Sequence, residues 1–563
     1  MLKSGNYKIV HEIPPPVMDG RMCCLDVETF QMTDGKLHRP NGTFACVSIL
    51  IEGDDTVYQV LEEDWVEKAL NMLGGTWVFH NALFDLRQLR RYAEIEPRFI
   101  WDTMLVSQSL YGGLYMHHGL KHLVRRDLNE LMPKQERENF KTATVMTDEM
   151  KIYAAEDVIK TLKLAIGQRD EFEDSPELKT YLTIDEPCIF PILDMPGARI
   201  DTVRWEKMLG DFVENAKTLQ DELGINVKSP AQVRAFLSDQ GVHVKSTARD
   251  VLEEIEGDNP TISLILEARR FRDAVSKYGY KWIEKHVELD GYAYAGYNIS
   301  QAKTGRMSCA NPNFQNIPSR HMPEYREMFI ASPGHSYLVW DVSQQEIRIM
   351  AWESKDTELL RAIDADEDLH LTAARGVFND PSLTKKDGEK RSIGKAINLG
   401  LQYGLTEFGL AKQLNVTVEQ AAKFILKYFN RFKGVFNWLG WSQQQAAQKG
   451  FVRTAGGRRF FVNTYTKNWK NNAINSPIQG GAADFTKMWV RRVWEACQFA
   501  KIPFLLVLIV HDEIVMDVPN DMVEVYTTII KNAFDETAAT LYPGVKFVVE
   551  GGQGDNWRVQ HGN

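Results

Sequence analysis

Residues 504–518 read FLLVLIVHDEIVMDV, two apolar arms on either side of His511, Asp512 and Glu513. Each arm has the length of a buried strand, so the segment predicts a β-hairpin with acidic residues at its turn. Aspartate is common in turns for reasons of backbone conformation alone. Here both arms are apolar enough to be buried. Acids at the tip of such a hairpin are expected to face a specific cavity rather than bulk water.

Two further segments carry chemically related side chains. Residues 337–341 read YLVWD, an apolar strand that ends in Asp341, and residues 390–404 read KRSIGKAINLGLQYG. On a helix, the second segment places two cations before an apolar, aromatic stretch, an order that suits a triphosphate at one end and a base at the other. A plain amphipathic helix would show the same spacing. The side chains that recur every four residues are Arg391, Lys395, Leu399 and Tyr403.

Acidic residues also mark the predicted elements of the N-terminal third. Asp26 and Glu28 lie two apart on a strand, so both point to one face. Asp85 follows another strand, and the i, i+4 spacing of Tyr153 and Asp157 brings them together on a helix. Any one of these acids alone is most often a surface charge or a helix cap. Four gathered carboxylates repel one another unless divalent cations lie between them, and two such ions can cleave a phosphodiester.

Apolar periodicity divides the chain into three regions. Strands alternate with helices at first, which predicts a mixed α/β domain that ends near residue 183. A helix-dominated region follows, and the pattern becomes mixed again from about residue 290. The predicted strands are 22–30, 45–52, 76–80, 336–341 and 504–518, and the predicted helices are 81–94, 146–168, those within 203–286 and those from 355 to 450.

The composition limits the class of protein. The chain has 563 residues, too many for one core, and its 44% hydrophobic and 25% charged residues are an ordinary globular mixture. Its longest apolar run, Phe504–Val510, is far shorter than the ~20 residues of a membrane helix. Six cysteines without a Cys-x-x-Cys pair favour a reducing, cytoplasmic compartment. The net charge of −10 does not exclude nucleic-acid binding, because a binding groove needs only a local basic surface.

In this order and setting, the five N-terminal residues resemble the DEDDy exonuclease family, which includes the proofreading domains of polymerases and the RNase D group. The resemblance implies an RNase H-like fold and two bound divalent metals. It implies that Asp26, Glu28, Asp85 and Asp157 hold the metals, while Tyr153 and Glu28 orient the attacking water.

The later segments resemble motifs A, B and C of family A DNA polymerases. Motif A is DVSQQEIR at 341–348, motif B is the helix at 390–404, and motif C is HDE at 511–513. Further matches are TGR at 304–306, NPNFQNIP at 311–318, NSPIQGGAAD at 475–484 and GDNW at 554–557. With the exonuclease motifs, the likeness covers essentially the whole chain.

The polymerase resemblance implies roles for the matched residues. Asp341, Asp512 and the Val342 carbonyl would hold two Mg²⁺ ions, for which Mn²⁺ can substitute, and Glu513 would support them. Glu346 corresponds to the steric gate that leaves no room for a 2′-OH. Lys395 would also give a proton to the leaving pyrophosphate. The implied nucleotide contacts are Gln344, Glu346, His370, Arg391, Lys395, Leu399 and Tyr403.

The same resemblance implies contacts with DNA. Arg306 and Gln479 would probe the minor groove, whose acceptors are nearly the same for every base pair, so that they test pairing geometry. The other implied DNA contacts are Asn313, Gln315, Asn316 and His511. The expected partners are primer-template DNA, dNTPs and replisome proteins (a helicase, a primase, a single-strand binding protein), with the chain acting as a monomer.

The implied architecture is an exonuclease domain followed by a right-hand polymerase. The expected parts are the exonuclease at 1–183, a helical thumb at 184–298, a palm at 299–355 and 471–563, and fingers at 356–470. About two dozen residues precede Asp26, and nothing there resembles a 5′-nuclease domain, which favours a phage or viral replicative enzyme, although organellar enzymes share the layout.

Leu399 departs from the family, where an aromatic residue is usual, and an aliphatic side chain cannot stack as an aromatic ring does. Two alternatives to a proofreading polymerase remain. One is a repair nuclease with a weak polymerase half. The other is a non-catalytic primer-template binding factor, which the intact acids at both sites disfavour.

Overall fold

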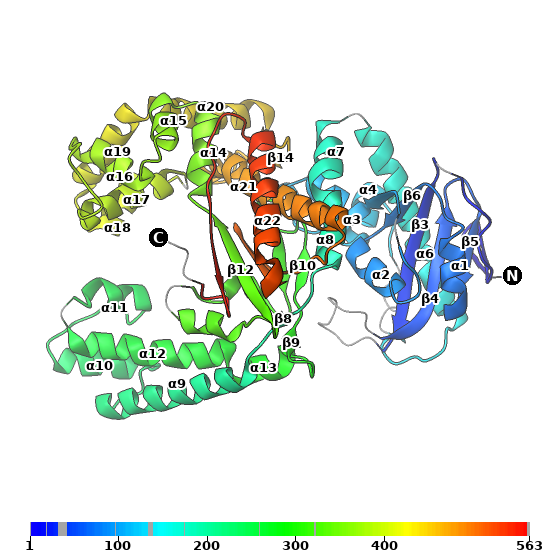
Figure 1. The fold of residues 1–563 in the computed structure, drawn as a ribbon, viewed down its shortest axis with the longest axis horizontal. Helices are drawn as coiled ribbons and strands as arrows, with labels where there is room; N and C mark the ends of the chain where they lie inside the picture. The colour runs from blue at the N-terminus through cyan, green and yellow to red at the C-terminus, as the bar shows by residue number, and fades with distance from the viewer. Residues whose placement is uncertain are drawn as a thin grey trace.

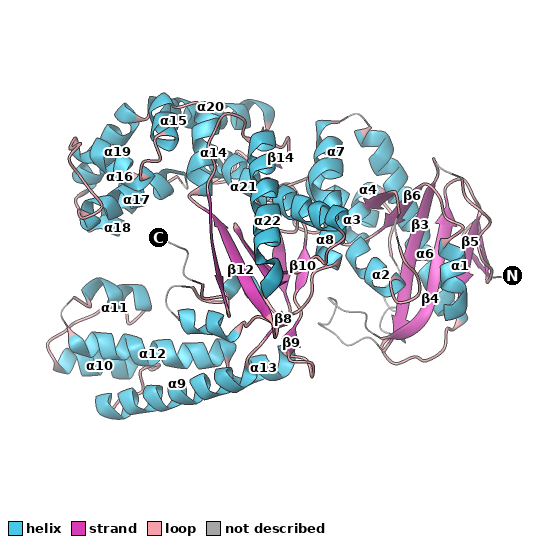
Figure 2. Cartoon of the chain, in the orientation of Figure 1, coloured by secondary structure: helices cyan, strands magenta, loops and turns pink. Residues whose placement is uncertain are grey.

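The structure is a computed structural model, and it describes residues 2–18, 20–31, 42–95, 97–132, 139–173, 175–257, 259–319, 322–402 and 404–559. A seven-stranded sheet with its helices lies at one end of the molecule, and a four-stranded sheet lies near the middle (Figure 1). Helical groups lie above and below the second sheet in this view (Figure 2). Among the described helices, none has the length and apolar composition that a membrane crossing requires.

The N-terminal sheet is mixed, with strand order β1-β2-β5-β4-β3-β6-β7. The inner strand β3 pairs antiparallel with β4 and parallel with β6, and β6 pairs parallel with β7. In β3 the polar residues Asp26 and Glu28 alternate with buried Val27, as the sequence predicts. The strands are β1 (Leu2–Ser4), β2 (Tyr7–Val10), β3 (Met22–Phe30), β4 (Thr43–Ile51), β5 (Thr56–Val60), β6 (Thr76–Phe79) and β7 (Phe99–Asp102).

Helices follow the parallel strands and cover this sheet. The longest, α6, packs against β3 and β4 and begins at a Thr147 cap, whose side chain accepts a hydrogen bond from the Met150 N–H. The short helices α2 and α3 each begin at the end of a parallel strand. The described helices of this region are α1 (Val66–Leu70), α2 (Ala82–Leu89), α3 (Thr103–Leu110), α4 (Leu120–Asp127), α6 (Asp148–Phe172), α7 (Pro176–Thr180) and α8 (Ile189–Leu193).

Two long helices, α9 and α12, lie side by side below the second sheet in Figure 1. Helix α9 ends at Gly224, whose φ of 63° provides the left-handed cap that glycine favours. Trp282, within a basic stretch of sequence, stacks on Trp205 with 4.6 Å between ring centroids and belongs to the core. The helices are α9 (Thr202–Leu223), α10 (Pro230–Asp239), α11 (Arg249–Ile255), α12 (Pro260–Tyr278) and α13 (Tyr280–His286). Two strand pairs flank them: β8 (Ala198–Arg199), before α9, pairs with β9 (Tyr292–Ala293), after α13, and β10 (Gly296–Asn298) pairs with β11 (Ser308–Ala310).

The second sheet is antiparallel, with strand order β15-β16-β12-β17. The predicted hairpin is confirmed: β15 and β16 are joined by His511 and Asp512, and His511 has a φ of 61°. Glu513 does not lie in the turn but opens β16 opposite Asp341. The elements are β12 (His335–Val342), β15 (Leu506–Val510), β16 (Glu513–Pro519), β17 (Val549–Gly554) and the helices α21 (Trp469–Ala500) and α22 (Val523–Leu541).

The remaining helices lie beyond this sheet. Helices α16 and α17 approach so closely that a Cβ on Gly394 would lie 2.2 Å from the carbonyl oxygen of His370, so only glycine fits there. The elements are α14 (Gln345–Ser354), α15 (Thr357–Asp364), α16 (Leu369–Phe378), α17 (Gly388–Gln402), α18 (Glu407–Leu414), α19 (Val418–Arg431), α20 (Lys433–Lys449), β13 (Phe451–Arg453) and β14 (Arg459–Phe461).

A buried cluster of ion pairs joins the N-terminal and C-terminal parts. Asp185 lies 2.7 Å from a guanidinium nitrogen of Arg458 and 2.6 Å from Lys487 Nζ, and Arg458 also binds Asp484 at 2.7 Å. Burial alone would raise the pKa of Asp185, but the charges of Arg458 and Lys487 hold it well below its ordinary value. Two cations thus balance two anions in a region closed to water, which is the condition for burying charge.

Candidate active sites

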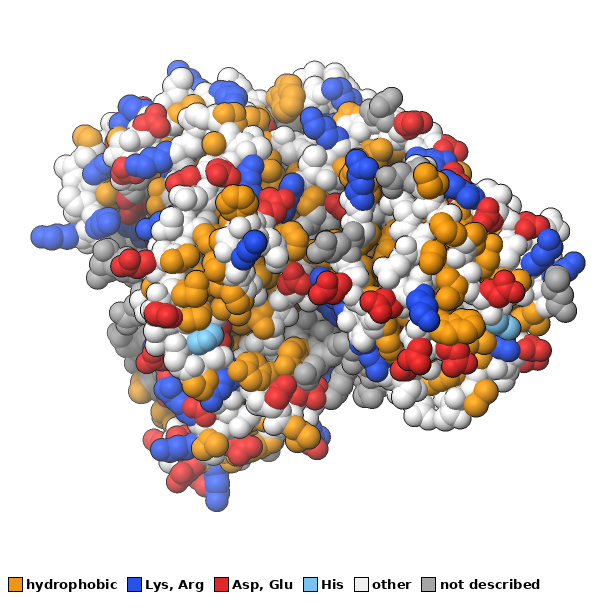
Figure 3. All heavy atoms as spheres, turned by 45° about the vertical axis from the view of Figure 1, so that its right-hand side comes forward, with side chains coloured by type: hydrophobic (Ala, Val, Ile, Leu, Met, Phe, Trp, Pro, Cys, Tyr) orange, Lys and Arg blue, Asp and Glu red, His pale blue; other side chains and the backbone are white. Residues whose placement is uncertain are grey.

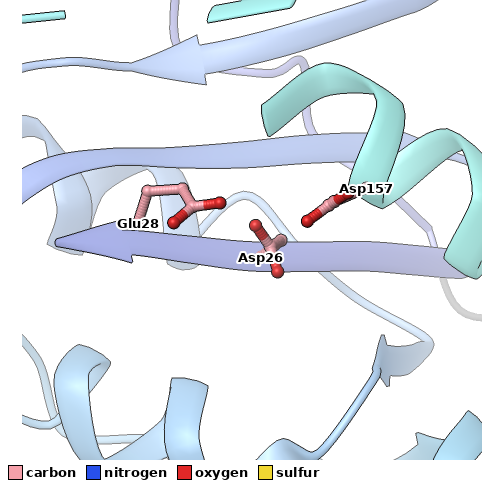
Figure 4. Close-up of side chains that lie close together, drawn as sticks. All are labelled: Asp26, Glu28 and Asp157. Carbon is pink, nitrogen blue, oxygen red and sulfur yellow. The ribbon is translucent and has the colours of Figure 1, made fainter. Parts of the chain in front are cut away.

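Three acidic side chains converge at the N-terminal sheet. Asp26 and Glu28 come from β3 and Asp157 from helix α6 above it, and the three carboxylates face one another (Figure 4). One oxygen from each lies within 4.8 Å of the others. No other group of three acidic, histidine or cysteine side chains in the described part of the chain converges so closely. We call Asp26, Glu28 and Asp157, with Asp85 beside them, the N-terminal acid site.

Asp85 adjoins this group without being part of its closest contacts. It lies in the first turn of α2, and its Oδ1 accepts a hydrogen bond of 2.9 Å from the Val27 N–H, between the two acids of β3. Burial and the charge of Asp26 raise the pKa of Asp85 well above its ordinary value. Tyr153 lies one turn before Asp157 on α6, packed near Phe140. All five residues predicted from the sequence therefore lie on elements that meet here.

The N-terminal acid site has the donor set that hard divalent cations prefer. Mg²⁺, Mn²⁺ and Ca²⁺ bind carboxylate oxygens, and three carboxylates within 4.8 Å supply such oxygens from two elements. Neighbouring carboxylates also repel one another, a cost that a bound cation removes. The residues present thus fit the divalent metals expected from the sequence.

A second group of acids lies at the end of the β15-β16 hairpin. The Val342 N–H donates to the Asp512 carbonyl oxygen at 3.3 Å, which holds the end of β12 against the turn. Strand register places Glu513 on one side of Asp341 and Glu550 on the other. We call Asp341, Val342 and Asp512, with Glu513 and Glu550, the C-terminal acid site.

Burial and mutual repulsion change the acidity of this second site. Burial, followed by the charges of Glu513 and Glu550, raises the pKa of Asp341 to about 6. Burial, followed by the charge of Asp341, raises the pKa of Asp512 to about 7. Carboxylates that resist ionisation in isolation become good ligands when a cation is present. The Val342 carbonyl is a further oxygen at this place, so these residues also fit divalent metals.

Glu513 is neutralised by the protein itself. Its two carboxylate oxygens each lie 3.2 Å from Arg326 Nη1, and Trp557 Nε1 donates to Oε1 at 2.7 Å. The Arg326 guanidinium also lies over the Trp557 ring, 4.1 Å from its centroid. Sequence reasoning found Trp557 within GDNW but missed Arg326 and Glu550. Neither has a local sequence signal, because Glu550 faces Asp341 only through the pairing of β17 with β12 and Arg326 is distant in sequence from Glu513.

The predicted nucleotide helix is α17. Arg391 Nε donates to Asp368 at 2.8 Å, and Asp368 also caps α16 through the N–H groups of His370 and Leu371. Burial lowers the pKa of His370 to about 4, so its ring is neutral at pH 7. Lys395, which faces the same region, contributes to that shift. Leu399 is half-buried on α17, and Tyr403 lies outside the described residues.

Residues predicted to select the sugar and to probe DNA contact one another. Arg306 donates to the Glu346 carboxylate at 2.8 Å. Glu346 lies in the first turn of α14, a helix that begins after Gln344, whose φ is 52°. This ion pair links the segment before β12 to motif A. The residue predicted to select the sugar and the residue predicted to probe the DNA therefore lie side by side in the fold.

The other predicted DNA contacts lie near the hairpin. Gln315 Nε2 donates to the carbonyl oxygens of Met307 (3.2 Å) and Ile509 (3.4 Å), so its amide is engaged within the protein. Asn313 caps the short turn η4 (Phe314–Asn316) by accepting the Gln315 N–H. The remaining positions are exposed Asn316 and His511, and half-buried Gln479 on α21. On the face in Figure 3, acidic and basic side chains are interspersed rather than separated by sign.

Comparison with known families matches both parts of the chain. The model of the family "3'-5' exonuclease" matches residues 41–166, and that of "DNA polymerase family A" matches residues 202–559. The exonuclease match includes Asp85, Tyr153 and Asp157 but begins after Asp26 and Glu28. The convergence of Asp26 and Glu28 with Asp157 is therefore an observation that does not depend on the family match.

Several curated relatives are bacterial DNA polymerases. DNA polymerase I of Pseudomonas aeruginosa is 36% identical over 437 residues, covering 73% of this chain and 47% of that protein. DNA polymerase I of Rhizobium leguminosarum is 30% identical over 532 residues (86% and 51%), and that of Aquifex aeolicus is 29% identical over 545 residues (89% and 91%). The chain thus spans about half the length of the first two relatives.

A solved structure has the same fold. The POL domain of Pol1 from M. smegmatis, in complex with DNA primer-template and dNTP, superposes with a TM-score of 0.80 at 23% sequence identity, covering 96% of this chain and 99% of that one. With the two family matches, this likeness confirms the expected mixed α/β fold, an exonuclease-type domain followed by a polymerase-type domain. The predicted domain boundaries stay predictions.

Proposed function

Because the chain belongs to DNA polymerase family A, we propose that it extends a DNA primer with dNTPs on a template and removes nucleotides from the 3′ end at a separate site. The observation that carries this proposal is the presence of two acid sites in one chain. Asp26, Glu28 and Asp157 converge at one of them, and Asp341 lies beside Asp512 at the other. Metal-assisted phosphoryl transfer needs such carboxylates at each site of reaction.

In the proposed extension reaction, Asp341, Asp512 and the Val342 carbonyl would hold two Mg²⁺ ions, with Mn²⁺ as a substitute. When bound there, these ions would lower the pKa of the primer 3′-OH and neutralise the negative charge of the triphosphate. Arg391 and Lys395 bind the triphosphate, and Lys395 gives a proton to the leaving pyrophosphate.

Other residues of the same site select and orient the substrates. Glu346, held by Arg306 at 2.8 Å, lies beneath the sugar and excludes a 2′-OH. Gln344, neutral His370, Leu399 and Tyr403 are the further proposed nucleotide contacts. The proposed DNA contacts are Arg306, Asn313, Gln315, Asn316, Gln479 and His511.

In the proposed proofreading reaction, Asp26, Glu28, Asp85 and Asp157 would hold two divalent ions, which supply an activated water and stabilise the leaving oxygen. Glu28 and Tyr153 orient that water. Burial of Asp85 against the backbone of β3 supports this arrangement, because it leaves little freedom in the carboxylate's position.

A single assay separates the proposal from its alternatives. A labelled primer-template is incubated with Mg²⁺, with and without dNTPs. Extension with dNTPs and shortening without them supports a proofreading polymerase. Shortening alone favours a repair nuclease, and neither reaction favours a non-catalytic binding factor.

Leu399 offers a finer test of nucleotide handling. An aliphatic residue at this place on α17 cannot stack as an aromatic ring does, so we expect altered selection between deoxy- and dideoxynucleotides. Leu399→Phe and Leu399→Tyr should change the ratio of dideoxynucleotide to deoxynucleotide incorporation, measured by primer extension with both present. Unchanged ratios in both variants would contradict this role.

The cellular setting is also a proposal. All six cysteines are free thiols buried in the protein, which supports a reducing location such as the cytoplasm. A helicase, a primase and a single-strand binding protein are proposed partners, and a monomer is the proposed state. A phage or viral source stays a prediction, because the relatives described above are bacterial.

A further inference from the structure

A buried carboxylate outside the N-terminal acid site supports one of its elements. Asp102 is the last residue of β7 and only 3% exposed. Its Oδ1 accepts hydrogen bonds from the N–H groups of Asn81 (3.0 Å), Met104 (2.9 Å) and Leu105 (3.2 Å). Its Oδ2 accepts from the N–H of Ala82 at 2.8 Å. Four backbone donors thus meet at one side chain.

These donors belong to the starts of two helices. Asn81 and Ala82 begin α2, and Met104 and Leu105 lie in the first turn of α3. A helix start leaves backbone N–H groups that need a partner. Asn81 has a φ of 73°, and its own side chain makes no cap. Asp102 therefore supplies the cap for α2 as well as for α3, and joins both helices to the end of β7.

The start of α2 determines the position of a predicted metal ligand. Asp85 lies three residues after Ala82, in the first turn, with its Oδ1 on the Val27 N–H at 2.9 Å. Asp102 is itself fixed, since its N–H donates to Tyr181 Oη at 3.0 Å and this hydroxyl donates to the Ile100 carbonyl at 2.8 Å. Hydrogen bonds to Asp102 thus hold the start of the helix that carries Asp85 at the end of β7.

We propose that Asp102 is a positioning residue of the N-terminal acid site, which holds Asp85 in place for metal binding through the start of α2. This inference rests on the proposed exonuclease function. Asp102 is not among the acids that converge at the site, and its hold on the position of Asp85 passes through the start of α2. Substitution of a residue that orients a metal ligand without binding the metal itself typically lowers metal affinity or activity by about 10–100-fold.

The test is Asp102→Asn, which keeps size but replaces one oxygen with an NH₂ group. In either orientation of the amide, at least one backbone N–H then faces a donor. We expect the exonuclease kcat to fall about 10–100-fold with KM for single-stranded DNA unchanged, and primer extension by the same chain to be unaffected.

The matched control is Asp356→Asn in the polymerase part. Asp356 is also 3% exposed and also joins two helix starts, accepting from Leu359 N–H (2.9 Å) on α15 and Gly434 N–H (2.7 Å) on α20. This control should leave the exonuclease unchanged. An equal exonuclease loss in both variants, or an equal loss of exonuclease and extension in Asp102→Asn, would show a general effect on stability and overturn the proposal.

A binding measurement keeps the test independent of activity. Mn²⁺ binding is followed by electron paramagnetic resonance on full-length chains that all carry Asp341→Ala, which weakens the C-terminal acid site. Asp102→Asn should weaken the remaining Mn²⁺ binding about 10-fold, and Tyr181→Phe, which removes the hydroxyl that holds Asp102, should weaken it less. Unchanged Mn²⁺ affinity in both would refute the positioning role. Absence of shortening by the unmodified chain would refute the exonuclease function, while the Mn²⁺ result would still decide the role of Asp102.

Discussion

The two acid sites gather negative charge in different ways. At the N-terminal acid site, three carboxylates from a strand and a helix converge within 4.8 Å. At the C-terminal acid site, three carboxylates lie side by side across a sheet, but one of them, Glu513, is bound by Arg326 and Trp557. The second site therefore carries part of its counter-charge within the protein, in the Arg326 guanidinium.

This difference assigns different functions to neighbouring acids of the same sequence motif. Asp512 and Glu513 are adjacent, yet Asp512 lies in the turn beside Asp341 and Glu513 opens β16 with a permanent cation. A carboxylate already paired with arginine is a poor competitor for a metal ion, because both of its oxygens are engaged. We therefore expect Asp341 and Asp512, rather than Glu513, to bind metals at this site, and Glu513 to hold the end of the hairpin in place through Arg326 and Trp557.

The largest expected effect comes from removing one metal-binding acid at each site. Asp341→Ala should lower primer extension by about 10³-fold or more and spare 3′-end shortening, while Asp26→Ala should do the reverse. Rates are measured on one labelled primer-template with and without dNTPs. Each variant serves as the control for the other. A substitution that lowers both activities to the same extent would show that the sites are not independent.

Removing the internal cation of the C-terminal acid site should destabilise the protein. Arg326→Met leaves Glu513, which is 6% exposed, as an unpaired buried charge, so we expect a loss of about 3 kcal/mol in the free energy of unfolding. Denaturant unfolding followed by fluorescence measures this loss. The double variant with Glu513→Gln should recover most of it, since no buried charge then remains.

A surface pair supplies the control for that experiment. Arg249 and Glu253 form an i, i+4 pair on α11 with both side chains about half exposed, and Arg249→Met should cost less than about 1 kcal/mol. If Arg326→Met were as mild as Arg249→Met, the idea that Glu513 depends on its internal cation would be wrong.

The sequence predicts much of this arrangement because the decisive patterns are local. Alternation places Asp26 and Glu28 on one face of β3, and helical spacing places Tyr153 and Asp157 on one side of α6, as the structure has them. The hairpin at His511 follows from two apolar arms of strand length. Periodicity and turn chemistry act over a few residues, and so they can be read without knowledge of the rest of the fold.

Contacts between distant segments could not be predicted in this way. Arg326 meets Glu513 across 187 positions of the chain, and Asp185 meets Lys487 across 302. Glu550 faces Asp341 only because β17 pairs with β12 in one particular register. Asp102 reads as an ordinary helix cap in the sequence, and its second helix is apparent only in three dimensions. Where opposite charges meet in the core depends on the topology rather than on local propensity.

The smallest expected effect concerns the acids that do remain for metals. EDTA removes divalent metal ions, so the acidity of the metal-free protein can be tested. The pKa of Asp512 is about 7 in the folded protein, whereas that of an aspartate in an unfolded chain is about 4. The folded protein therefore favours the protonated form of Asp512. The stabilisation that protonated Asp512 gives to the folded state is complete below about pH 4 and is lost as the pH rises through about 7.

At pH 8 Asp512→Asn should therefore raise Tm by about 2 °C, and at pH 5 the gain should shrink. Asp535→Asn, at an exposed position of α22, is the control and should leave Tm unchanged at both pH values. Differential scanning calorimetry at the two pH values measures the effect, and a lower Tm for Asp512→Asn at both would mean that this carboxylate stabilises the metal-free fold, contrary to the repulsion inferred at the C-terminal acid site.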